Sequence, residues 1–184
     1  MASSSEAPGT PLAGPRMEER KALLVAGLMK TFTPDTVNEI QKLWQELTPH
    51  FGKIPGEVGH KAYGVVYNMK NSTEFAYLAG VEVSSAADVP DELSVVRIPD
   101  IAYAVFPHNG HVSSLKDTIA TIWNDWLPAS GHRVGRMDEE MPDIVEQYDE
   151  SFDPKTGMGG MEIWVPIKMR ARMINVEPNP TEPV

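Results

Sequence analysis

The hydrophobic residues of this chain recur with two different periods, and their order predicts strands and helices in a repeated arrangement. Short runs rich in β-branched and aromatic residues are typical of strands. They occupy residues 22–32, 61–69, 74–84, 93–98, 101–106, 144–148 and 160–168. Two longer segments carry apolar residues three and four positions apart, as one face of a helix does. These helices are expected to begin after Thr33 and Ser114, because Ser and Thr are favoured at N-caps. The first strand is expected to break or bulge at Gly27.

The predicted elements repeat with a period of about half the chain. Trp44 and Trp123 lie 79 residues apart on the two predicted helices, and the strand motifs GVEV and GMEI begin 80 residues apart at Gly80 and Gly160. A period this long indicates duplication of a whole subdomain rather than a solenoid. We therefore predict two strand-helix-strand-strand units, at about residues 21–90 and 91–170.

The last predicted strand places a carboxylate on a defined face. Successive side chains of a strand point to opposite sides of the sheet. Its apolar residues share the side expected to face the helices: Met161, Ile163, Val165 and Ile167. Glu162 and Trp164 share the other side, as Glu82 does in the first unit. That side is either solvated or the wall of a binding cleft, and the large apolar surface of an indole favours a cleft.

Composition restricts the classes of function. The formal net charge of -10 argues against a general nucleic-acid binder, and the absence of cysteine excludes disulfides and thiol chemistry. Eight acids lie between Asp138 and Lys155, a run that is either a solvated loop or a negative field attracting cationic ligands. We expect a cytoplasmic protein without a membrane segment, with a disordered leader over residues 1–20 and a disordered tail over 173–184.

At this point the chain resembles a known family, the GyrI-like small-molecule-binding domain, which is also the effector-binding domain of bacterial multidrug-sensing transcription regulators. Four segments carry the resemblance in the order found in the family: EFAYLAGVEVS (74–84), YAVFPHNGHVSSLKDTIATIWNDWLPASG (103–131), VEQYDESFDP (145–154) and MEIWVPIK (161–168). No helix-turn-helix precedes them, so the chain is similar to the stand-alone form and direct binding to nucleic acid is not expected.

The resemblance implies an α+β fold over residues 21–172, with duplicated strand-helix-strand-strand units, two antiparallel sheets around a central pocket and helices on the outer faces. In the family a glutamate on the last strand contacts cationic, lipophilic or aromatic ligands, and the matching motif carries that role onto Glu162. The aromatic residues matched to the pocket are Tyr67, Tyr77, Tyr148 and Trp164. The helix tryptophans are expected in the core: Trp44, Trp123 and Trp126.

Three functions follow from this resemblance. The first is sensing or sequestering of a lipophilic or cationic small molecule, with Glu162 as counter-charge. The second is a hydrolase that opens strained, cyclopropane-type electrophiles, with Glu162 as general base and Tyr148 or Tyr67 as proton donor. The third is interaction with a protein partner such as DNA gyrase or a regulator. No cofactor is expected, and His108 and His111 lack a third ligand for a metal.

Overall fold

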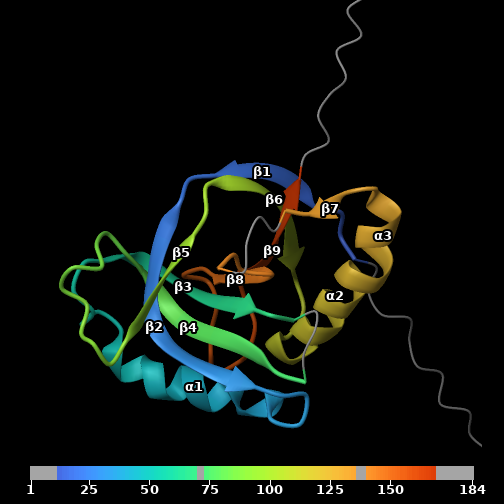
Figure 1. The fold of residues 1–184 in the computed structure, drawn as a ribbon. Helices are drawn as coiled ribbons and strands as arrows, with labels where there is room; N and C mark the ends of the chain where they lie inside the picture. Colours follow the sequence, from blue (N-terminus) through green and yellow to red (C-terminus); the bar gives the residue numbers. More distant parts are fainter. Residues whose placement is uncertain (1–11, 70–72, 136–139, 169–184) are drawn as a thin grey trace, which may run out of the picture.

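A computed structural model of the chain describes residues 12–69, 73–135 and 140–168 (Figure 1). The predicted tail at 173–184 and the first eleven residues of the predicted leader lie outside this described part. Among the described residues an antiparallel sheet forms the centre of the molecule, and helical segments cover one of its faces.

The strands follow the predicted order, with two additions. Their bounds are β1 (Arg16–Arg20), β2 (Leu23–Phe32), β3 (Glu57–Tyr67), β4 (Phe75–Val83), β5 (Ser94–Ile98), β6 (Ile101–His108), β7 (Arg133–Val134), β8 (Ile144–Tyr148) and β9 (Met161–Lys168). The additions are β1 and β7. The predicted strand break at Gly27 is wrong, because β2 keeps an unbroken register with β4 through that residue.

The duplication is visible in the order of the strands. Along the sheet they run β1-β6-β9-β8-β3-β4-β2-β5, and β7 pairs with β9 beside this path. The first unit contributes β3, β4 and β2, and the second contributes β8, β9 and β6 in the mirrored order. Pairing of β3 with β8 therefore joins the two expected sheets into one sheet that curls into a half-barrel (Figure 1).

Each unit places its helical segment on the same face of the sheet. In the first, a 3₁₀ turn η1 (Val37–Glu39), α1 (Ile40–Leu47) and a second 3₁₀ turn η2 (Thr48–His50) follow β2. In the second, η3 (Val112–Ser114), α2 (Leu115–Thr121), the π-helical η4 (Ile122–Trp126) and α3 (Leu127–Ser130) follow β6. Gly131, in the left-handed conformation, ends the second segment. No helix in the described ranges is long and apolar enough to cross a bilayer.

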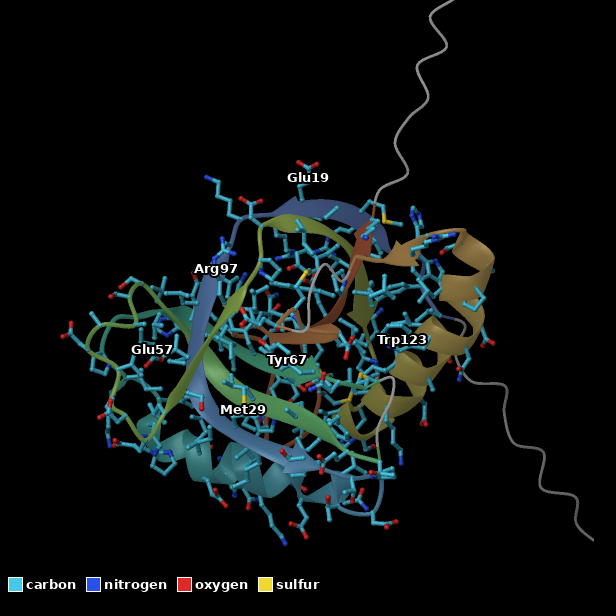
Figure 2. All side chains as sticks on the ribbon, viewed as in Figure 1. Glu19, Met29, Glu57, Tyr67, Arg97 and Trp123 are labelled. Carbon is cyan, nitrogen blue, oxygen red and sulfur yellow. The ribbon has the colours of Figure 1, made fainter. Side chains whose placement is uncertain are left out.

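The two faces of the sheet bury separate sets of side chains. The helix-facing set includes Leu43 and Leu47 of α1, Ile122 of η4 and the predicted apolar face of β9. The other set, which we call the inner-face cluster, consists of Val25, Tyr63, Val65, Tyr67, Leu78, Ile98, Tyr103, Val105, Val145 and Trp164. Tyr67 lies within the curl of the sheet in Figure 2. The alternation predicted for β9 is thus confirmed, because Trp164 lies opposite the helix-facing residues.

The prediction of a disordered leader extends too far along the chain. Residues Arg16–Arg20 form β1, which pairs with β6 along its whole length, from Arg16 opposite Val105 to Arg20 opposite Ile101. The segment lacks the hydrophobic alternation by which a strand is recognised, since its inward positions are Arg16, Glu18 and Arg20. Glu19, between them, points away from the molecule (Figure 2).

The close approach of β2 to β4 depends on glycine. A Cβ atom at Gly27 would overlap the backbone of Ala79 and Gly80, which the strand cannot avoid without shifting its register. We therefore expect Gly27→Ala to lower the free energy of unfolding by about 2 kcal/mol or more. Urea denaturation followed by tryptophan fluorescence measures this change. Gly14→Ala is the control, because a Cβ there meets no atom within 4 Å; equal stability of both variants would contradict the packing argument.

Candidate functional site

The structure divides the five predicted site residues between two faces of the sheet. Glu162, Trp164 and Tyr67 belong to the inner face, whereas Tyr77 and Tyr148 belong to the helix-facing core. The reason is register: on β8 and β9, Gln147 pairs with Glu162, so Tyr148 faces the other way. Tyr148 and Glu162 therefore cannot share one ligand, and the predicted pairing of these two residues in a hydrolase is not formed.

Glu162 on the inner face is surrounded by donors and cations. Its Oε1 accepts a hydrogen bond from Arg16 Nη2 at 2.6 Å, and its Oε2 accepts one from Arg20 Nη2 at 3.3 Å. Oε2 also accepts from Gln147 Nε2 at 3.4 Å and from Trp164 Nε1 at 3.3 Å. The negative charge of Glu162 is therefore balanced within the chain, by two arginines of β1.

Trp164 is the centre of the inner-face cluster. Its ring lies 5.9 Å from the rings of Tyr63 and Tyr103, and the guanidinium carbon of Arg20 lies 3.8 Å from its centroid. Only 1% of Trp164 is exposed. Tyr67 is in the same cluster, and burial raises its pKa to about 12. One aromatic residue thus carries a stacked cation while its own N–H group binds the neighbouring carboxylate.

Tyr77 and Tyr148 instead surround Glu146, a residue that the sequence analysis did not select. The Tyr77 hydroxyl donates to Glu146 Oε2 at 2.6 Å, and the Tyr148 hydroxyl donates to the same atom at 2.9 Å. Trp44 of α1 donates its Nε1–H to the Tyr77 oxygen at 3.1 Å. The contacts thus run from Trp44 on α1 through Tyr77 on β4 to the Glu146 carboxylate on β8.

Electrostatics distinguishes Glu146 from Glu162. Burial raises the pKa of the Glu146 carboxyl above its usual value of 4.5, while the hydrogen bonds from Tyr77 and Tyr148 oppose this change. Burial, together with the negative charge of Glu146, also raises the pKa of both tyrosines well above 10.0. Among the residues that the structure describes, no arginine, lysine or histidine forms an ion pair with Glu146. Within the described ranges, this buried acid is therefore without a counter-ion.

Aromatic rings pack against Tyr148, one of the two tyrosines that hold the Glu146 carboxylate. The ring of Trp44 lies 5.4 Å from that of Tyr148 in an edge-to-face arrangement, and the ring of Phe152 lies 4.9 Å from Tyr148. Across the strand pair, Glu146 is opposite Gly64, where a Cβ would collide with the Tyr77 hydroxyl and the Glu146 carboxylate. Glycine at this position thus provides the space that the carboxylate and the tyrosine hydroxyl occupy.

The sequence indicates an unusual position for Glu146, but this residue was counted with the neighbouring acids as part of one charged run. Glu146 is one of the eight acids between Asp138 and Lys155, but it and Asp143 are buried rather than part of a solvated loop. Within β8, Glu146 shares a face with Ile144 and Tyr148, so a carboxylate stands on an apolar face of a central strand. A charged residue at such a position is unusual unless it is paired or functional. In the described part of the chain, no group of three or more His, Asp or Glu residues is arranged to bind a metal.

Comparison with known proteins finds a matching family and a curated relative. The GyrI-like small molecule binding domain matches residues 14–168. The transcriptional regulator BrlR of Pseudomonas aeruginosa is 28% identical over 154 residues, which are 83% of this chain and 54% of BrlR. The chain thus spans about half the length of this curated relative.

Two solved structures share the fold at low sequence identity. SAV2435 bound to tetraphenylphosphonium has a TM-score of 0.65 at 16% identity, over 85% of this chain and 94% of that one. An integron cassette protein of Vibrio cholerae has a TM-score of 0.62 at 17% identity, over 85% of this chain and 97% of that one. At these identities the likeness concerns the fold.

The raised pKa of Glu146 makes a prediction about stability and pH. Below 4.5 the carboxyl is protonated in both folded and unfolded chains, but above it the unfolded chain ionises first. We expect the wild type to lose free energy of unfolding relative to Glu146→Gln as pH rises from 4.5 to the folded-state pKa, by about 1.4 kcal/mol for each pH unit of that interval. Denaturant titrations across this range measure the difference. Glu46→Gln, which removes an exposed carboxylate of α1 paired with Lys30, corrects for loss of one charge; a difference that does not grow with pH would contradict the assignment.

Proposed function

Because the chain belongs to the GyrI-like small-molecule-binding family, we propose that its ligands are hydrophobic aromatic cations and that Glu146 supplies the counter-charge. Binding would serve to sense or to sequester such molecules. The sequence pattern alone favoured Glu162 for this role. The observation that favours Glu146 is that it is a buried carboxylate held by two tyrosine hydroxyls, and that no arginine, lysine or histidine of the described residues pairs with it.

The energetic argument begins with the cost of a buried charge. Removing a carboxylate from water is unfavourable unless a counter-ion or several hydrogen bonds compensate, and here the compensation consists of two hydroxyl groups. A cation beside Oε2 would restore the missing attraction in a medium of low dielectric constant. A bound cation would favour the ionised form of Glu146 and so oppose the rise in pKa that burial causes. Glu162 offers no such gain, since Arg16 and Arg20 already balance it.

The aromatic residues around Glu146 suit the same class of ligand. Trp44, Tyr77, Tyr148 and Phe152 come from α1, β4, β8 and the segment after β8, so they surround the carboxylate from several directions. Rings attract cations through their negative faces and bury apolar substituents at the same time. The tetraphenylphosphonium bound by SAV2435 is a permanent cation carrying four aromatic rings, and this proposal extends that class of ligand to the present chain.

The access of a ligand to Glu146 would involve α1. This helix is eight residues long, with a 3₁₀ turn at each end, and it contacts the site through the single hydrogen bond from Trp44 to Tyr77 and through ring contacts. Short helices depend on tertiary packing for their stability. Displacement of α1 would expose the Glu146 carboxylate and its two tyrosines without breaking the β3–β8 pairing, at the cost of exposing Leu43 and Leu47, which α1 buries in the helix-facing core.

The test compares a cation with a neutral molecule of similar shape. Tetraphenylphosphonium and triphenylphosphine oxide are titrated into wild type, Glu146→Gln and Glu162→Gln by calorimetry. We expect Glu146→Gln to weaken binding of the cation by about tenfold or more and binding of the neutral compound by less than about threefold. Only the cation loses a charge pair. Glu162→Gln should change neither by more than about threefold. The cation should also bind more tightly as pH rises above 4.5 and Glu146 ionises.

Three results would contradict the proposal. Equal weakening of both compounds by Glu146→Gln would show that the charge is not what the ligand recognises. Selective weakening by Glu162→Gln would return the role to the residue that the sequence pattern favours. Absence of binding to the wild-type chain at millimolar tetraphenylphosphonium would exclude this class of ligand.

A further inference from the structure

The inner face of the sheet already holds a cation, which is the guanidinium group of Arg20. It stacks on the Trp164 ring at 3.8 Å and forms an ion pair with Glu162 at 3.3 Å. A ring face combined with a carboxylate is the arrangement by which proteins bind organic cations. Arg20 therefore shows which chemical group fits between Trp164 and Glu162.

In the described part of the sheet, the strand that carries Arg20 is attached along one side only. β1 is at the end of the sheet and pairs with β6 over five residues. Its inward side chains are charged: Arg16 and Arg20 bind Glu18 as well as Glu162, and the Arg16 side chain is 50% exposed. The ion pairs of the half-exposed Arg16 contribute little stability, whereas the Arg20–Glu162 pair is partly buried. A five-residue strand at the edge of a sheet can open locally. Arg20 thus occupies its place on an element that few buried contacts hold.

Two buried polar atoms show that Arg20 fits this place incompletely. Arg20 Nε and the side-chain oxygen of Gln147 are both buried without a hydrogen-bond partner in the described part of the chain. Gln147 is 6% exposed, and its Nε2 donates to Glu162 Oε2. A buried acceptor next to Glu162 favours a ligand that can donate to both groups. A flat amidinium group has N–H donors on two sides and meets this requirement.

We propose that the Glu162–Trp164 pair is a second cation site, specific for flat amidinium or guanidinium ligands, and that Arg20 is its internal occupant. A ligand has to displace the Arg20 side chain and compete with its ion pair. With Arg20 in place this second site is closed to other cations. The proposal depends on the inner face alone and holds whether or not Glu146 binds a ligand.

The experiment removes the occupant and supplies a replacement. Benzamidinium, with neutral benzamide as its matched control, is titrated into the full chain as wild type and as Arg20→Ala. The indole N–H signals of the four tryptophans are followed by NMR, with Trp164→Phe and Trp44→Phe used for assignment. We expect Arg20→Ala to bind benzamidinium at least about tenfold more tightly than wild type, with the largest shift at Trp164. Benzamide should bind both proteins equally weakly.

Matched variants separate this mechanism from a general loss of positive charge. Lys30→Ala also leaves a carboxylate, Glu46, without its partner, but that pair is about half exposed and has no stacked ring. It should not create a benzamidinium site. Arg20→Met keeps a side chain of similar size over Trp164 and removes the charge. Its affinity for benzamidinium should therefore rise less than that of Arg20→Ala. Adding Glu162→Gln to Arg20→Ala should abolish the gain.

A measurement on the wild type tests whether benzamidinium displaces Arg20 even if Arg20→Ala fails to fold. Millimolar benzamidinium should shift the Trp164 signal and accelerate hydrogen exchange of the β1 amides relative to those of β3, because Arg20 has to leave. No such shift and exchange in the wild type, no gain in folded Arg20→Ala, or a gain that survives Glu162→Gln would each overturn the proposal. A response at Trp44 to tetraphenylphosphonium reports separately on the Glu146 site, so the two proposals fail independently.

Discussion

Pairing between β3 and β8 is the interaction on which the rest of this structure depends. It joins the two duplicated units into one curled sheet, and it aligns Gly64 with Glu146 at the middle of that sheet. Without this pairing, β3 and β8 would each be an unpaired edge of a separate sheet. The same pairing that completes the core therefore brings a carboxylate from one unit next to a tyrosine from the other.

Glu162 and Glu146 differ in the groups that compensate their charge. Glu162 has two arginines as counter-ions and remains partly exposed, whereas Glu146 has hydroxyl donors and is buried. Hydroxyl groups can hold either a carboxylic acid or a carboxylate, but guanidinium groups hold only the carboxylate. The two carboxyl groups thus stand in different electrostatic environments. The difference arises from β1, whose Arg16 and Arg20 supply their positive charges to one face of the sheet only.

Several features could be predicted from the sequence because they depend on the spacing of residue types along the chain. The 80-residue spacing of GVEV and GMEI predicted the duplication, and alternation in β9 correctly separated Trp164 from its apolar neighbours. The same method failed for β1, whose positions carry charge where a strand normally carries apolar residues. It also failed to group the site residues. Tyr77 and Tyr148 matched one family motif each, but a motif does not state which face of the sheet its residue occupies relative to a residue on another strand.

The sequence by itself thus determined the class of the fold, its repeat, the acidic character and the residue types from which a cation site is built. Only the tertiary structure decided which acid belongs with which aromatic residues. The physical reason is that a period of two fixes faces within one strand, whereas the relation between strands depends on register and on which edges meet. Pairing of Gln147 with Glu162 turns Tyr148 away from Glu162, and pairing of Gly64 with Glu146 admits the Tyr77 hydroxyl. Both pairings join residues that are distant along the chain or lie across a long loop.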